Sequence, residues 1–131
     1  MRRNNPESDL QRAILAHLRT RGAAGLVYFH VPQGNKLGGA RSRKGVAIQG
    51  SINKGLGVRA GVSDLVLLHS GRFFALELKV PGRMPTAEQL RFLAEVNAAG
   101  GFGAWCQGLD LALDILEGWG LLRGKASTLE A

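Results

Sequence analysis

The sequence has almost no cysteine and no long hydrophobic run, and each absence excludes a class of protein. Cys106 is the single cysteine among 131 residues, so an intramolecular disulfide and a multi-cysteine zinc site are excluded. No apolar run approaches the roughly 18 residues that a membrane helix needs, and no signal-type apolar core follows the first residues. We therefore expect a reducing, cytosol-like compartment and no membrane association.

Acidic residues are absent from one long stretch of the chain. Nine basic residues but no acidic residue lie between Asp9 and Asp64. The formal net charge of +7 divides into +9 for residues 1–63 and −2 for the remainder. A solvated basic surface is one explanation, but a polyanionic partner, above all nucleic acid, explains a one-sided basic half better. An anionic membrane is a weaker explanation, because no basic segment has a continuous amphipathic face.

The hydrophobic pattern predicts a single α/β domain over residues 1–122, followed by a frayed tail at 123–131. Apolar spacings of three and four predict helices, and β-branched or aromatic runs predict strands. The expected elements are a helix at 6–22, a strand at 26–31, a hairpin at 62–80, a helix at 85–99, a strand at 102–107 and a helix at 109–119. The resulting order α-β-β-β-α-β-α predicts a mixed β-sheet flanked by helices.

Residues 32–61 form a long segment rich in glycine and basic residues, "PQGNKLGGARSRKGVAIQGSINKGLGVRAG". A loop of this length in a compact domain is usually functional or disordered. It lacks the glycine and lysine spacing of a nucleotide-binding P-loop. Because it carries six basic residues and no acidic one, we expect it to bind DNA phosphates. These candidate DNA-binding residues are Lys36, Arg41, Arg43, Lys44, Lys54 and Arg59.

The hairpin "VSDLVLLHSGRFFALELKV" carries three charges where a sheet should bury side chains. With the turn centred on Ser70 and Gly71, the register places Asp64 directly opposite Glu77. Lys79 follows two residues later on the same face. Like charges directly opposite each other destabilise a sheet, so this pair needs an explanation.

A divalent cation is one explanation for the paired carboxylates. Mg²⁺ and Mn²⁺ prefer carboxylate, carbonyl and water ligands, and a cation would remove the repulsion between Asp64 and Glu77. Lys79 could then orient an attacking water and stabilise developing charge. The alternative is a surface Glu–Lys pair on an exposed sheet face, with Asp64 capping a loop. The hairpin by itself leaves both interpretations open.

The spacing D-x(12)-E-x-K on a hairpin resembles the core of the PD-(D/E)XK nuclease superfamily. The surrounding motifs are most similar to its VRR-NUC branch of stand-alone phage and bacterial nucleases. They are Glu7 with Gln11 in the first helix, "GVSDLVLL", "LELK", and "TAEQL" with Gln89. The resemblance covers nearly the whole chain in order. Ser63 departs from it, because the family usually has proline before the aspartate.

The resemblance implies a PD-(D/E)XK restriction-endonuclease-like fold and a metal-dependent DNA endonuclease. It implies that Asp64, Glu77 and the backbone carbonyl of Leu78 bind Mg²⁺ or Mn²⁺ and that Lys79 serves the attacking water. Glu7 would add a further acid to the metal site, and Gln89 would support it. By similarity to Holliday-junction-cleaving members, it also implies branched DNA as substrate, a homodimer, and the cytoplasm of a bacterial or phage-infected cell.

Several of these residues have structural explanations as well. Glu7 could simply complement a helix N-terminus, and Gln89 could be half of a capping box with Thr86. Gln11 is a helix-surface residue that could line the site, and His30 ends a strand beside the basic loop and could contact phosphate. A rival function is a non-catalytic nucleic-acid-binding module whose carboxylates are structural.

Overall fold

The computed structural model describes residues 5–32 and 59–124. Within these ranges the elements are α1 (Pro6–Arg21), β1 (Val27–His30), β2 (Leu65–His69), β3 (Arg72–Lys79), α3 (Ala87–Ala98), β4 (Phe102–Gln107) and α4 (Leu109–Gly118). This order, α-β-β-β-α-β-α, confirms the prediction. Each boundary lies within three residues of the expected one. No helix in the described ranges is long and apolar enough to cross a membrane.

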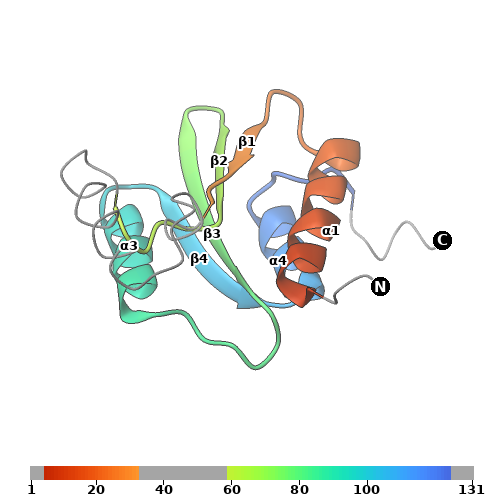
Figure 1. Cartoon of the computed structure of the whole chain (residues 1–131). Coiled ribbons are helices and arrows are strands. Elements are labelled where there is room, and N and C mark those ends of the chain that lie inside the picture. Colours follow the sequence, from red (N-terminus) through yellow and green to blue (C-terminus); the bar gives the residue numbers. More distant parts are fainter. Residues whose placement is uncertain (1–4, 33–58, 125–131) are drawn as a thin grey trace.

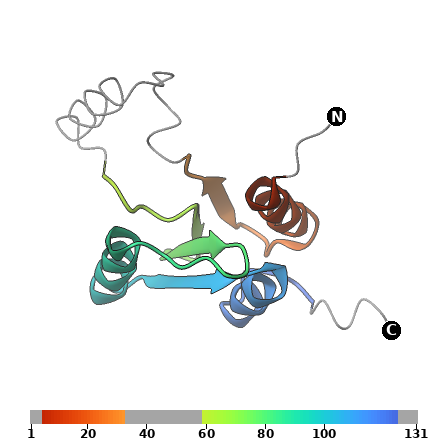
Figure 2. The ribbon, with the colours of Figure 1, turned by 60° about the horizontal axis from the view of Figure 1, so that its bottom comes forward.

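The four strands form one mixed sheet in the order β1-β2-β3-β4. The pairs β1–β2 and β2–β3 are antiparallel, whereas β3 and β4 are parallel and joined through α3. Helix α3 covers one face of the sheet, and α1 and α4 cover the other (Figure 1). The turned view in Figure 2 separates the same three layers. The predicted mixed sheet flanked by helices is therefore confirmed.

The hairpin of β2 and β3 has the register expected from its sequence. Ser70 and Gly71 both adopt positive φ, at 51° and 77°, as a two-residue turn of type I′ requires. His69 consequently pairs with Arg72, and the ladder continues to Leu65 opposite Leu76. One further step places Asp64, the residue before β2, opposite Glu77 near the end of β3.

Strand β3 is buried on both faces, which explains its nearly continuous apolar sequence. Leu76 belongs to the larger core with Ile14 of α1 and Leu116 of α4. Ala75 belongs to a smaller core with Leu93 of α3. Because side chains alternate along a strand, Glu77 follows Ala75 on the α3 face. The two helical layers thus meet the charged end of β3 from both sides.

The last turn of α1 is joined to the end of the described chain. Arg21 is buried, and its Nη2 donates to Glu117 Oε2 at 2.5 Å. Its Nη1 donates to the Arg123 carbonyl at 3.0 Å, and Gly22 forms a β-bridge with Leu122. These bonds join the end of α1 to α4 and to the segment that follows α4, which is described as far as Gly124. Residues 125–131, and with them most of the predicted frayed tail, lie outside the described residues.

Candidate active site

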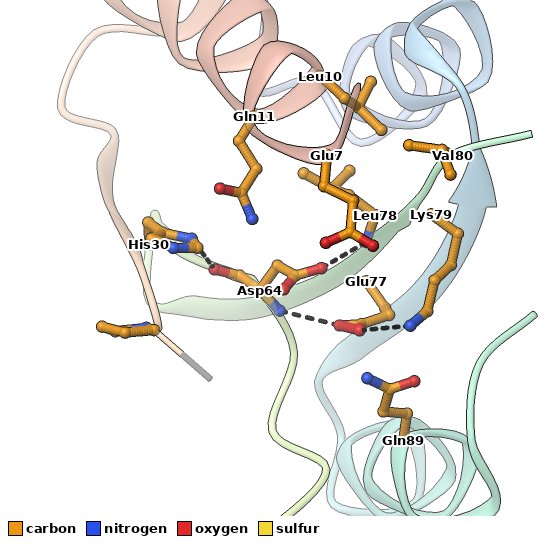
Figure 3. A pocket seen from close by; sticks show the side chains of 11 residues that line it. Glu7, Leu10, Gln11, His30, Asp64, Glu77, Leu78, Lys79, Val80 and Gln89 are labelled. Atoms are coloured by element: carbon orange, nitrogen blue, oxygen red, sulfur yellow. Dashed lines mark hydrogen bonds and ion pairs between the residues drawn. The ribbon is translucent and has the colours of Figure 1, made fainter. Parts of the chain in front are cut away.

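A pocket of about 340 Å³ opens at the charged end of the hairpin, between α1 and α3 (Figure 3). It gathers residues from both helices, from the end of β1 and from β3. The residues that line it are Glu7, Leu10, Gln11, His30, Pro32, Asp64, Glu77, Leu78, Lys79, Val80 and Gln89. All five side chains that the sequence analysis assigns to catalysis are among them. The basic loop residues at 36–54 lie outside the described residues, so their DNA-binding role stays a prediction.

Asp64 and Glu77 are held beside each other by two hydrogen bonds, each from a backbone N–H group to a carboxylate oxygen. The Asp64 backbone N–H donates to Glu77 Oε2 at 3.0 Å, and the Leu78 backbone N–H donates to Asp64 Oδ2 at 3.0 Å. Both carboxyl groups are buried, with residue exposures of 6% and 1%. Two backbone donors thus offset part of the cost of burying two acids, and they fix where the remaining oxygens point.

Lys79 provides the cation of this cluster. Its Nζ lies 3.6 Å from Glu77 Oε1, and the lysine side chain is 20% exposed whereas that of Glu77 is 1% exposed. Burial of the Glu77 carboxyl, with repulsion from Asp64, nevertheless raises its pKa from 4.5 to about 8. The stabilising contacts to Lys79 and the Asp64 backbone are weaker than these two effects. Without a cation, Glu77 therefore holds a proton at neutral pH.

The raised pKa of Glu77 predicts how the metal-free stability depends on pH. Between pH 4.5 and about 8 the folded protein keeps a proton that the unfolded chain has lost. The contribution of Glu77 to the free energy of unfolding is therefore fully present below pH 4.5 and is lost as the pH rises through about 8, by an amount on the order of a few kcal/mol. Glu77→Gln should remove most of this loss. Thermal melts in chelator from pH 5 to 9 would test it, and parallel curves for both proteins would contradict the assignment.

The two helices each contribute a polar side chain to the pocket. Glu7 lies in the first turn of α1, where Asn5 already caps the helix by accepting from the Ser8 N–H at 3.2 Å. Glu7 can therefore face the pocket, beside Gln11 one turn later. Gln89 forms the expected capping box, and its support of a metal site stays a prediction. Its Oε1 accepts from the Thr86 N–H at 2.8 Å in a complete capping box, and it lines the pocket opposite Glu7.

His30 is the ionisable residue of the pocket lining that the sequence motifs do not assign to the site. Its Nδ1 lies 3.0 Å from the Asp64 carbonyl oxygen, and it stands at the end of β1, where the ladder with β2 ends at Leu65. The sequence signal was its position at a strand end before the basic loop. That signal suggested a phosphate contact but not proximity to Asp64.

The segment leading into Asp64 is positioned by close packing against α3. Gly61 has φ +82°, and a Cβ there would lie 2.6 Å from the carbonyl carbon and oxygen of Glu88. Ser63 is 1% exposed, and its Oγ has no hydrogen-bond partner among the described residues. This is the position where the VRR-NUC pattern has proline, which needs no such partner. At position 61, glycine is thus required for two reasons: the positive φ and the close approach of the backbone to α3.

Gly61→Ala is predicted to cost more stability than the same change at Gly25. Gly25 has nearly the same φ, +80°, but nothing lies within 4 Å of an added Cβ. Gly25→Ala should cost about 1 kcal/mol from backbone conformation alone. Gly61→Ala adds overpacking against backbone atoms, for a total of about 2–4 kcal/mol. Equal losses in urea unfolding of the two variants would contradict the close approach to α3.

Arg59 is the one candidate DNA-binding residue that the structure describes. Its guanidinium forms an ion pair with Glu95 of α3 and lies 5.3 Å from the centroid of the Phe92 ring. Both ion-pair side chains are about half exposed, so the pair contributes little stability. These contacts tie the end of the basic loop to α3, and a role for Arg59 toward DNA stays a prediction.

The donor set fits a hard divalent cation. No group of three or more His, Cys, Asp or Glu residues forms a ready-made metal cluster in the described part of the chain. Mg²⁺ does not need one, because it is commonly bound by one or two carboxylates together with waters and substrate phosphates. Asp64 and Glu77, at the pocket floor, are the carboxylates that would bind such a cation. The energetic cost of ionising Glu77 is what a cation would offset.

A comparison with known proteins finds the same family in the fold that the sequence motifs resemble. No protein-family model and no curated protein matches the chain. A solved structure described as a "VRR_NUC domain protein" matches with a TM-score of 0.69, covering 90% of this chain and 90% of that chain at 16% identity. The chain has a VRR-NUC fold. Within this VRR-NUC fold, each of the four motifs contributes residues to one pocket. They are Glu7, Gln11, Asp64, Glu77, Leu78, Lys79 and Gln89.

Proposed function

We propose that this protein is a metal-dependent nuclease that hydrolyses phosphodiester bonds in DNA. The observation that carries the proposal is the gathering of Asp64, Glu77 and Lys79 in one pocket of a VRR-NUC fold. Structural carboxylates alone would not require a lysine at 3.6 Å beside an open pocket. The raised pKa of Glu77 supports the proposal further, because strongly shifted groups concentrate at functional sites.

Each residue has a distinct part in the proposed reaction. Asp64 and Glu77 would hold Mg²⁺ or Mn²⁺, with the Leu78 carbonyl and Glu7 as further oxygen donors. When bound there, such a cation would supply Lewis-acid polarisation of the phosphate and a lowered pKa for water. Lys79 orients the attacking water and stabilises negative charge in the transition state. Gln89, fixed by its capping box, supports the site from α3.

The basic loop is proposed to hold the DNA backbone. Its predicted contacts are electrostatic, so affinity should fall steeply with salt concentration. Neutralising Arg41, Arg43 and Lys44 together should weaken binding and reduce the log–log salt slope by roughly one unit per lost phosphate contact. The exposed Arg72, at the far turn of the hairpin, is the control for a lost positive charge. An unchanged slope in the triple variant would assign these three residues to solvent.

We propose that the substrate is branched DNA, such as a Holliday junction, and that the protein acts as a homodimer. Resolution of a four-way junction requires two cuts, and the described chain offers one pocket of this composition. Two copies would supply two sites. This part of the proposal is supported by the similarity of the motifs to junction-cleaving members of the family.

A panel of labelled substrates tests the proposal. Four-way, flap, single-stranded and linear duplex DNA would be incubated with the protein in Mg²⁺, Mn²⁺ or EDTA. The expected result is metal-dependent cleavage that is fastest on a branched substrate. Fastest cleavage of linear DNA would preserve the nuclease and remove the branched specificity.

The rival function is a non-catalytic nucleic-acid-binding module. One observation favours it: each carboxylate accepts a backbone N–H, which a structural role would also explain. Such a module would bind members of the panel equally well in Mn²⁺ and in EDTA and would cut none of them. The panel therefore separates the two functions.

A further inference from the structure

The connection between β3 and α3, residues 80–86, begins and ends beside the pocket. Val80 at its start and Gln89 just after its end both line the pocket, and in Figure 3 the Lys79 side chain lies between them. In Figure 1 the connection extends below the ends of β3 and β4. It carries no acidic side chain that would repel a phosphate. A nucleic acid bound at the pocket would therefore meet this connection.

Local turn chemistry fixes the first part of the connection. The Arg83 N–H donates to the Val80 carbonyl at 3.1 Å, which closes a turn over Pro81 and Gly82. Gly82 has φ +90°. Proline at the second position and a glycine of positive φ at the third are typical of a type II turn. The turn therefore sets the direction in which the chain continues to Met84.

The side chain of Gln107, the last residue of β4, holds the tip of the connection at residues 82–84. Its Oε1 accepts from the Gly82 N–H at 3.4 Å, and its Nε2 donates to the Arg83 carbonyl at 2.8 Å. The same Nε2 lies 3.7 Å from Met84 Sδ. Because Gln107 pairs with Lys79 in the ladder of β3 and β4, the tip is tied to the strand that carries the lysine.

Met84 is the most exposed large hydrophobic residue in the described ranges, at 65%. A single exposed apolar side chain is ordinary on a protein surface. Met84 differs because its backbone is held on both sides, by Gln107 and by the capping box that begins at Thr86. An apolar side chain on a backbone that is already ordered has a smaller entropy cost on binding. Met84 is thus an apolar contact prepared beside the pocket.

The reach of the connection corresponds to a few base pairs of DNA. Met84 follows Val80 by four residues, which span at most about 14 Å, or about four base pairs at roughly 3.4 Å each. Apolar side chains, methionine among them, act as wedges between neighbouring base steps. We propose that Met84 is such a wedge and inserts between bases beside the phosphodiester bond to be cut. This placement rests on the proposed nuclease function, which locates that bond at the pocket.

The cost of inserting a wedge determines which DNA it favours. Separating stacked bases is costly in a continuous duplex and costs least where bases are already unpaired or poorly stacked. The bases at a branch point are of the second kind. Met84 would therefore favour branched DNA over continuous duplex through the shape of the substrate and not through its base sequence.

Unstacking and binding can be measured without cleavage. The probe is a four-way junction that carries the fluorescent base 2-aminopurine next to the branch point. A linear duplex with the same base in the same sequence is the comparison. Both are titrated with the full-length protein in EDTA, so that metal-dependent cleavage does not occur. Because 2-aminopurine becomes brighter when it loses its stacking neighbours, each titration reports unstacking and affinity together.

The wild type is expected to brighten the junction and not the duplex. Met84→Ala should bind the junction about tenfold more weakly, the order expected when one apolar side chain is no longer buried, and should leave it as dim as free DNA. Its affinity for the duplex should not change. Met84→Leu keeps the apolar volume and should behave as the wild type. Leu111→Ala should also do so, because Leu111 is 53% exposed on α4 and does not line the pocket.

Three results would overturn the proposal. One is a junction that the wild type does not brighten, or that Met84→Ala brightens equally. Another is an equal loss of affinity for junction and duplex in Met84→Ala. The third is dissociation of a dimer by Met84→Ala without DNA, measured by sedimentation, which would assign the side chain to a protein contact. A wild type that brightens the junction but does not cut it after Mn²⁺ is added would instead overturn the nuclease function and leave the unstacking by Met84 in place.

Discussion

Asp64→Asn and Glu77→Gln are expected to lose Mn²⁺ binding and DNA cleavage together, with cleavage falling about a thousandfold or more. Each change removes one of two carboxylates at the pocket floor while keeping an oxygen that can accept the neighbouring backbone N–H. The loss corresponds to the several kcal/mol that a correctly held cation contributes to a transition state. Calorimetric Mn²⁺ titration and single-turnover cleavage, run on the same preparations, would measure both effects.

The control for these two variants is Glu88→Gln. Glu88 is exposed in the first turn of α3, next to Gln89, and it does not line the pocket. This variant should bind Mn²⁺ and cut DNA as the wild type does. Normal Mn²⁺ affinity in either Asp64→Asn or Glu77→Gln would show that the cation site is wrongly assigned.

Lys79→Ala is expected to separate chemistry from binding. The lysine is 3.6 Å from Glu77 and partly exposed toward the pocket, so we assign it to the water and the transition state. Cleavage should fall by about a hundredfold or more, as for loss of one preorganised electrostatic group. DNA affinity should change little, because we assign the phosphate contacts to the six basic residues of the loop. Gel-shift titration in Ca²⁺ or EDTA and single-turnover rates in Mn²⁺ give the two quantities.

Arg83→Ala is the matched control for Lys79→Ala. Arg83 is an exposed basic residue that follows β3 without lining the pocket. Its loss should leave the single-turnover rate unchanged. If Lys79→Ala cuts at the wild-type rate, the lysine is a partner of Glu77 alone and the binding-module interpretation gains.

The arrangement of the acidic pair could be predicted because it depends on local chain geometry. A two-residue turn at Ser70 and Gly71 fixes the hairpin register. With the register fixed, counting along two strands brings Asp64 to Glu77 and puts Lys79 on the same face. The capping box of Thr86 and Gln89 is local in the same way. Such features need no knowledge of tertiary packing.

The rest of the pocket depends on tertiary packing, which the spacing of residues does not encode. His30 meets Asp64 across 34 positions of sequence, and Gln11 faces the pocket because α1 packs over the end of the sheet. Arg59 is a second residue whose tertiary contact could not be predicted from the sequence. Its basic charge predicted a phosphate contact, and the structure pairs it with Glu95, 36 positions later.

Metal-initiated cleavage is the most direct test that Asp64, Glu77 and Lys79 form a nuclease site. Wild-type protein and Asp64→Asn would each be mixed in EDTA with end-labelled four-way-junction and linear duplex DNA. Excess Mn²⁺ would then be added and products followed over time at pH 8. We expect intact DNA before the addition, rapid product formation by the wild type afterwards, and no product from Asp64→Asn. Cleavage in EDTA, or equal cleavage by the two proteins, would contradict it.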